Sequence, residues 1–269
     1  MLFVLLLAVL AGGIRAQTVP SPGPLYSSES LVNAATNLPG LVAPNSIVSL
    51  YGQRLAWATR AISGDDIKSG FLPKTLLGTG THVTIGRIAA SVYYVSPTQV
   101  NLLVPSNLAP GEHTLQLTVD GRAGPTVRIK LADVSPGLFL INADTIAATR
   151  PDGSVVTRES PAAPGDVVVL YATGLGTTVP RFTDGELATT AAQIVERSRF
   201  RLFIDGQPVD DHLIFYVGVT PTYAGLYQIN LILPNDIGDD PEIRIAIGDV
   251  MSPPGTPLPV RRPPEEELQ

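Results

Sequence analysis

One short pattern occurs twice in this chain, and the repeat constrains the fold more than any other feature. Residues 96–105 read Ser-Pro-Thr-Gln-Val-Asn-Leu-Leu-Val-Pro, and a looser copy at 220–234 leads from Thr-Pro-Thr to Gln-Ile-Asn-Leu-Ile-Leu-Pro. Each copy has a turn, an apolar run with a Gln and an Asn two residues apart, and a closing Pro, which predicts one strand between turns. The sequence therefore predicts two similar halves.

A second pair of stretches repeats in the same order along the chain. Residues 43–51 read Ala-Pro-Asn-Ser-Ile-Val-Ser-Leu-Tyr, and residues 163–171 read Ala-Pro-Gly-Asp-Val-Val-Val-Leu-Tyr. Repeat units this long exceed the periods of solenoid proteins, so the pattern favours two tandem domains over a solenoid.

Hydrophobic alternation supplies the fold class. Leu115, Leu117 and Val119 alternate with polar residues, which predicts a strand with one buried face. Asp120 and Gly121 form a turn signal, and alternation resumes over 127–131, so we expect a hairpin. The run 167–171 is continuously apolar, as in a strand covered on both faces. The predicted class is all-β, with two tandem immunoglobulin-like antiparallel β-sandwich domains.

The N-terminal segment of the sequence predicts export. An apolar run opens the sequence and small residues follow it, which is typical of a secretory signal peptide and too short for a membrane span. No basic residue precedes the run, which indicates a start codon placed too late. We expect a secreted, periplasmic or cell-surface protein with no membrane span after signal cleavage. The predicted segments are a signal peptide (1–16), a linker (17–30), a first domain (31–134), a second domain (135–252) and a Pro-rich, acidic, disordered tail (253–269).

Composition narrows the classes of partner. The formal net charge is −6 and 16% of residues are charged, so the chain lacks the basic excess that binds nucleic acid backbones. The chain has no Cys, so no disulfide can form and packing alone must hold the fold.

Motifs for catalysis or metal binding are missing from the sequence. The three histidines have no partner at metal-ligand spacing, no Gly-x-Ser-x-Gly elbow occurs, and the glycine-rich stretches lack phosphate-loop and dinucleotide patterns. Three acidic pairs lie in loops without EF-hand spacing, so we interpret them as solvated turn residues, with a calcium site as the alternative. No cofactor, metal or catalytic residue is predicted. The histidines are His82, His113 and His212, and the pairs are Asp65–Asp66, Asp210–Asp211 and Asp239–Asp240.

Five residues remain as candidates for a site or a structural device. Trp57, the one tryptophan, follows a predicted strand, where it either contacts a ligand or caps the core. Gln99 with Asn101, and Gln228 with Asn230, share a strand face within each pair. These amides could read a sugar or a peptide edge, but their occurrence in both halves favours a repeated structural role.

Several of these motifs together resemble a known family. Residues 94–101, 135–139, 163–176 and 225–230 are similar to the Solibacter-type C-terminal domain, a family of uncharacterised bacterial exported proteins. The resemblance covers nearly the whole mature chain and implies export and the fold, whose halves also resemble IPT/TIG domains. The family has no established activity, so the resemblance implies no catalytic residue.

The functional expectation follows from the predicted signal peptide, the strand-rich repeat and the lack of a catalytic motif. We expect an exported, non-enzymatic binding or structural module whose partner is an unknown extracellular protein or glycan. A carbohydrate-binding accessory protein is the first alternative, with Trp57 as a contact. A hydrolase with no recognisable motif is the second alternative.

Overall fold

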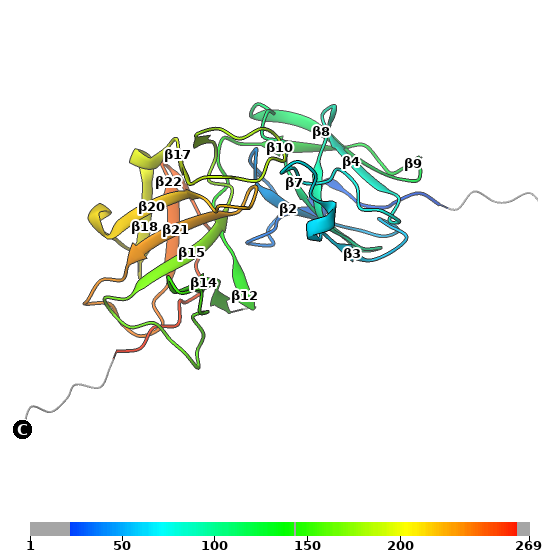
Figure 1. Ribbon diagram of the computed structural model, residues 1–269. Coiled ribbons are helices and arrows are strands. Elements are labelled where there is room, and N and C mark those ends of the chain that lie inside the picture. Colours follow the sequence, from blue (N-terminus) through cyan, green and yellow to red (C-terminus); the bar gives the residue numbers. More distant parts are fainter. Residues whose placement is uncertain (1–21, 143, 263–269) are drawn as a thin grey trace, which may run out of the picture.

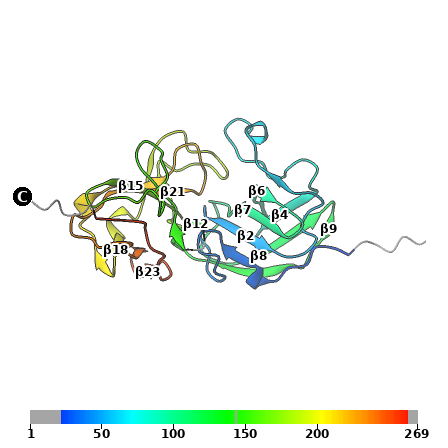
Figure 2. The same cartoon turned by 90° about the horizontal axis from the view of Figure 1, so that it is seen from below.

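The computed structural model describes residues 22–142 and 144–262, and this part of the chain is all-β (Figure 1). It forms two immunoglobulin-like antiparallel β-sandwiches in tandem, the first coloured blue to green and the second green to red. Seen from below, the two sandwiches form separate lobes along the long axis of the molecule (Figure 2). The predicted fold class is confirmed.

The first sandwich contains two antiparallel sheets. One has the order β1-β2-β7-β6-β3, and the other has the order β10-β8-β4-β5 with β9 paired to β8. Two 3₁₀ turns, η1 (Ser28–Ser30) and η2 (Gly64–Asp66), lie in its connections. The strands are β1 (Leu31–Asn33), β2 (Ile47–Tyr51), β3 (Arg60–Ala61), β4 (Thr81–Ile85), β5 (Ile88–Ala89), β6 (Ser91–Val95), β7 (Gln99–Leu103), β8 (Gly111–Val119), β9 (Arg122–Ala123) and β10 (Val127–Leu131).

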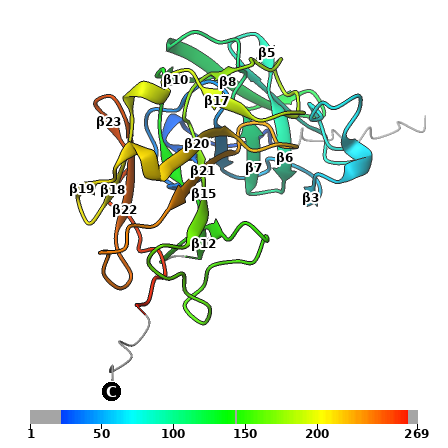
Figure 3. The ribbon, with the colours of Figure 1, turned by 60° about the vertical axis from the view of Figure 1, so that its left-hand side comes forward.

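The second sandwich has a larger sheet, and Figure 3 shows β15, β21 and β20 side by side within it. Its order is β11-β15-β21-β20-β17-β16 with β14 paired to β15, and it faces the sheet β19-β18-β22-β23. The hairpin β12-β13 and the turns η3 (Arg197–Arg199) and η4 (Asp211–Leu213) complete the lobe. The strands are β11 (Gly137–Leu138), β12 (Leu140–Asn142), β13 (Thr145–Ile146), β14 (Ala148–Thr149), β15 (Val167–Thr173), β16 (Thr178–Val179), β17 (Ala192–Ile194), β18 (Phe200–Ile204), β19 (Gln207–Pro208), β20 (Ile214–Val219), β21 (Tyr227–Ile232), β22 (Ile243–Ile247) and β23 (Val250–Met251).

Each sandwich has its own hydrophobic core. The buried cluster of the first runs from Leu31 to Leu131 and that of the second from Val134 to Val260. Leu115, Leu117 and Val119 are at most 2% exposed, as their alternation predicts. Asp120 and Gly121 both have positive φ, which a tight hairpin turn requires and which Asp and Gly tolerate.

The sequence repeat corresponds to two strand pairs with equivalent registers. β2 pairs with β7 so that Tyr51 lies opposite Gln99, and β15 pairs with β21 so that Tyr171 lies opposite Gln228. The next strand in each sheet, β6 or β20, has a β-bulge at the same place. The repeated stretches therefore occupy the same positions in two central strand pairs.

The segment before Leu31 differs from the predicted linker. Leu25 exchanges backbone hydrogen bonds with Gln53, at 2.9 Å in both directions. The Tyr26 hydroxyl donates to the Pro125 carbonyl oxygen at 2.7 Å and accepts from the Leu117 backbone N–H at 2.7 Å. Partial burial raises the pKa of the Tyr26 phenol, so it stays neutral and can donate. The described part of this segment thus packs on the first core.

The predicted disordered tail is also partly wrong. Leu258 and Val260 are fully buried in the second core. Val260 forms a parallel bridge with Ala162, and Pro257 forms an antiparallel bridge with Glu242. These residues contribute buried side chains to the second core, so the domain continues past 252. The predicted signal peptide and the acidic end of the tail lie outside the described residues. Within those residues, no helix is long and apolar enough to span a membrane.

Candidate functional site

The two sandwiches are joined by an apolar contact. Leu72 and Leu103 from the first sandwich and Ala224 from the second form a buried cluster of their own. Beside it, the Tyr93 hydroxyl donates to the Ala224 carbonyl oxygen at 2.5 Å. Burial raises the pKa of the Tyr93 phenol, so this hydroxyl stays protonated as the hydrogen bond requires.

Backbone and side-chain hydrogen bonds reinforce this contact on both sides. The Leu72 N–H donates to the Gly185 carbonyl oxygen, and the Leu187 N–H donates to the Gly70 carbonyl oxygen, both at 2.8 Å. Further along, the Asn45 amide donates to the Tyr227 hydroxyl at 3.0 Å. Contacts of several kinds therefore fix the sandwiches relative to each other.

Asp184 links the second sandwich to two separate points of the first. Its carboxylate accepts from the Lys74 ammonium at 2.5 Å and from the Ser106 backbone N–H at 3.1 Å. The Asp184 side chain is 14% exposed and that of Lys74 is 37% exposed, so water only partly screens the pair.

We expect Asp184→Ala to lower the free energy of unfolding by about 1–2 kcal/mol, because it removes a charged acceptor and leaves the Ser106 N–H without its partner. Urea denaturation followed by circular dichroism measures this loss. The control is Asp236→Ala, since Asp236 is exposed and has no hydrogen bond or ion pair among the described residues. Equal losses in the two variants would contradict a role for Asp184 in docking.

A large cleft opens between the docked sandwiches. Its volume is about 780 Å³, within the range of about 300–1,000 Å³ that is usual for ligand sites. One wall comes from the loop 106–110 of the first sandwich. The other comes from residues on either side of β16 (Gly176, Thr177 and Arg181), from η3 and from the β22-β23 hairpin of the second. Residues 132–134, at the junction between the sandwiches, also line it. We call this the interdomain cleft.

The interdomain cleft has a mixed lining. Leu108, Ile247 and Val250 contribute apolar surface. The Arg199 guanidinium pairs with the Glu196 carboxylate at 3.0 Å. Arg181, which is exposed, has no hydrogen bond or ion pair among the described residues. The lining therefore offers apolar contacts together with one cation that is available to a ligand.

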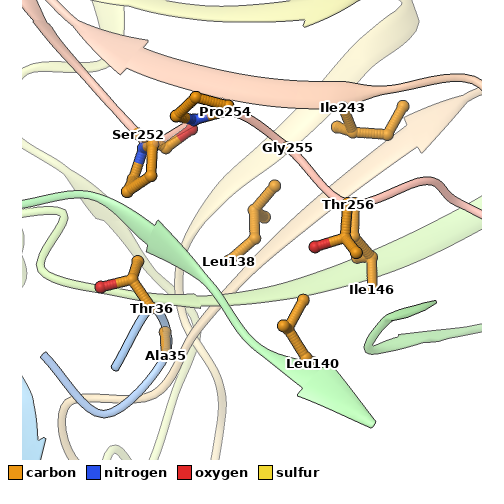
Figure 4. A pocket seen from close by; sticks show the side chains of 11 residues that line it. Ala35, Thr36, Leu138, Leu140, Ile146, Ile243, Ser252, Pro254, Gly255 and Thr256 are labelled. Atoms are coloured by element: carbon orange, nitrogen blue, oxygen red, sulfur yellow. The ribbon is translucent and has the colours of Figure 1, made fainter. Parts of the chain in front are cut away.

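A second recess at the junction is much smaller. Figure 4 shows it between the Ala35–Thr36 turn, Leu138 and Leu140 on one side and the segment 252–256 on the other. Its volume is about 90 Å³, well below the usual size of a ligand site. We therefore regard it as a packing defect between elements.

Trp57 lies away from the interdomain cleft, at the β8-β9 end of the first sandwich. Its indole N–H donates to the Asp120 carboxylate at 2.6 Å, and the Arg122 guanidinium lies 5.3 Å from its ring centroid. The residue is 47% exposed. Its polar edge and one ring face are thus occupied by the protein, so a stacked sugar would need the other face. Ligand binding at Trp57 stays a prediction.

The structure brings the members of each repeated amide pair into direct contact. Gln99 Nε2 donates to Asn101 Oδ1 at 2.8 Å, and Gln228 Nε2 donates to Asn230 Oδ1 at 3.1 Å. The Ser49 hydroxyl also donates to Asn101 Oδ1, at 3.0 Å. The pairs lie on outward faces of the two sheets and not in the interdomain cleft.

The acidic pairs contact arginines in the structure. Asp66 pairs with Arg60 at 2.7 Å, Asp211 with Arg197 at 2.7 Å, and Asp240 with Arg261 at 2.7 Å. Within residues 22–142 and 144–262, no three Asp, Glu or His side chains gather as metal ligands would. His113 Nε2 lies 2.8 Å from the Ala109 carbonyl oxygen, which is a local loop contact.

No protein-family model and no curated protein matches this sequence. Among solved structures, a surface glycan-binding protein SGBP-B of the Bacteroides ovatus mixed-linkage glucan utilization locus is similar over 82% of this chain, with 11% identity and a TM-score of 0.33. PbSGBP-B from Prevotella bryantii is similar over 88%, with 12% identity and a TM-score of 0.25. The chain spans 44% and 42% of those two proteins. Domains 5–6 of the S-layer protein SbsC are similar over 89% of this chain and 99% of their own length, with 8% identity and a TM-score of 0.28. Likenesses this distant do not transfer a function.

Proposed function

We propose that this chain is a non-enzymatic binding module that works outside the cytoplasm, and that its ligand occupies the interdomain cleft. The observation that carries the proposal is a cleft of about 780 Å³ between two sandwiches that are fixed against each other. Because the walls of this cleft are already in place, ligand binding does not have to pay the entropic cost of ordering them, and this favours affinity. The apolar run at the N-terminus of the sequence, which is typical of a secretory signal peptide, supports a location outside the cytoplasm.

The lining of the interdomain cleft favours binding over hydrolysis. Its described residues include no histidine, and its carboxylates are those of Asp133 and Glu196. Glu196 already pairs with Arg199. A hydrolase would need a nucleophile with an adjacent base, and these residues do not form such a pair. Membership of the Solibacter-type family is part of the same proposal and is supported by the repeated motifs.

Filling the cleft tests the proposal. Ala109 is an exposed residue of the cleft wall, so Ala109→Trp adds a bulky ring to the cleft without entering a core. We expect a ligand from a panel of short peptides to raise the melting temperature of the wild type and to have no effect on this variant. Ala61→Trp, at an exposed position of the edge strand β3, is the control and should keep the full shift.

Two results would contradict this proposal. One is a ligand shift that persists undiminished in Ala109→Trp, which would move the site elsewhere. The other is the absence of a shift with every member of the panel at millimolar concentration, which would favour a structural module.

A further inference from the structure

Each sandwich carries the same four polar and aromatic side chains on its outward sheet face. In the first sandwich Tyr51 lies opposite Gln99, and Tyr94 lies opposite Asn101. In the second sandwich the same register places Tyr171 opposite Gln228 and Tyr216 opposite Asn230. We call these two groups of four residues the sheet-face clusters. They recur at equivalent positions of two different sandwiches, so they are one arrangement built twice.

The sheet-face clusters face away from the cores. On β21, Tyr227, Ile229 and Leu231 are buried in the core, so the alternate residues Gln228 and Asn230 point to the opposite side. The second cluster is bordered by exposed apolar side chains, with Phe215 51% exposed and Ile232 37% exposed. Its four members are partly exposed. The face is therefore open to a ligand.

The aromatic members lie along the sheet on either side of the amides. The Tyr216 hydroxyl donates to the Val219 carbonyl oxygen at 2.8 Å, which holds the ring over Gly218. A Cβ at Gly218 would overlap the Ala192 carbonyl oxygen and would lie 2.6 Å from that hydroxyl, so glycine leaves room for both. Tyr171 is held by a hydrogen bond of 3.1 Å between its hydroxyl and that of Thr149. The two rings thus have fixed positions.

In each cluster the amide pair leaves one amide oxygen and one whole amide NH₂ group without a partner. Because Gln Nε2 donates to Asn Oδ1, the atoms Gln Oε1 and Asn Nδ2 remain, and neither has a partner among the described residues. The one buried side-chain polar atom without a partner in that part of the chain is Thr220 Oγ1, so these four atoms must reach solvent. Each amide pair holds its free donor and acceptor in a set direction.

We propose that the sheet-face clusters are saccharide-binding subsites. A pyranose presents hydroxyls that both donate and accept, together with apolar C–H surface. An oriented Asn Nδ2 donor, a Gln Oε1 acceptor and flanking tyrosine rings match those groups. A peptide cannot add as a strand here, because β7 and β21 are each paired on both sides. This inference goes beyond the interdomain cleft and uses none of its residues.

Asn230→Asp separates a binding role from a structural one. The substitution keeps an oxygen that accepts from Gln228 Nε2 and removes the open Nδ2 donor. A structural role for the pair therefore predicts little change in the variant, whereas a binding role predicts a loss. Asn101→Asp is the equivalent change in the first sandwich. Asn142→Asp is the matched control, because Asn142 is exposed on β12 and the charge change is the same.

Affinity gel electrophoresis with four neutral polysaccharides measures the effect: mixed-linkage β-glucan, xylan, galactomannan and dextran. We expect at least one to retard the wild type and the Asn142→Asp control. Asn230→Asp should bind about tenfold more weakly, as the loss of one well-placed hydrogen bond implies, and the double variant with Asn101→Asp should not be retarded. Ala109→Trp should be retarded normally, which distinguishes this site from the interdomain cleft.

Circular dichroism melting of each variant shows whether it is folded. Tyr51→Ala is the second probe, because Tyr51 is 38% exposed and makes no side-chain hydrogen bond in the described chain. This variant should weaken retardation without unfolding the sandwich. Wild-type mobility unchanged by all four polysaccharides overturns the proposal. Retardation that persists in the folded Asn101→Asp, Asn230→Asp double variant also overturns it.

Discussion

A chain that ends at Ser252 is expected to lose its second sandwich. The deletion removes Leu258 and Val260, each fully buried in that core. Burying such a side chain contributes about 1.5–3 kcal/mol, so the two together contribute about 3–6 kcal/mol, which is comparable with the lower end of the stability of a typical domain, about 5–15 kcal/mol. It also removes the Pro259 carbonyl oxygen that accepts from the Ala162 N–H at 2.9 Å. The amide NMR spectrum should then show dispersed signals for the first sandwich only.

The control for this deletion is a chain that ends at Arg262, which keeps every one of these contacts and should retain the full spectrum. Leu258→Ala provides the graded version, with an expected loss of about 2–5 kcal/mol in urea denaturation. Dispersed amide signals for the second sandwich in the chain that ends at Ser252 would show that residues 253–262 are not needed for that domain to fold.

This segment shows how composition can conceal a strand-like pattern. Prolines at 257 and 259 suggest a disordered tail, yet Leu258 and Val260 between and after them alternate with period two, as edge strands do. The ladder bonds of this segment use the N–H of Leu258, which donates to the Pro241 carbonyl oxygen at 3.0 Å, so the prolines occupy positions that need no donor. The alternation of apolar residues correctly indicates an ordered segment here, whereas the proline content points to disorder.

The strands themselves were predictable because their signals are local. Alternation identifies the buried face of β8, and the turn at Asp120 and Gly121 places its hairpin. The repeated Gln and Asn can be assigned to one face from spacing alone. Their register against Tyr51 and Tyr171 depends on strand pairing across the sheet, which no local pattern encodes.

The candidate sites could be predicted only in part, for the same reason. The interdomain cleft is lined by residues from Pro44 to Val250, and it exists only because the sandwiches dock at one particular angle. That angle is set by contacts such as Asp184 with Lys74, which are 110 residues apart. Trp57 stands out by its residue type, but its partners Asp120 and Arg122 come from a distant hairpin.

The junction between the sandwiches should be most sensitive at Gly174, where Gly174→Ala is expected to cost about 4 kcal/mol or more. This residue has φ +76°, and a Cβ at this position would overlap the Ser135 carbonyl oxygen. That oxygen accepts from the Asn33 amide at 3.0 Å, and the Ser135 N–H donates to the Gly174 carbonyl oxygen at 2.8 Å. Because the obstructing atom belongs to the backbone, no side-chain rotation can relieve the contact.

Gly153→Ala isolates the steric effect from the backbone strain. Gly153 has φ +85°, and a methyl group added to its Cα would meet no atom within 4 Å, so the alanine variant should lose only the strain of a left-handed residue, about 1–2 kcal/mol. Urea denaturation gives both losses. Small-angle scattering of Gly174→Ala should also show a longer molecule, since moving Ser135 releases the tie from Asn33 that holds the first sandwich to the junction. Equal losses of stability in the two variants, with unchanged scattering, would contradict this prediction. They would mean that the junction backbone shifts to accommodate the methyl group, and that the contacts near Tyr93 and Asp184 alone set the angle between the sandwiches.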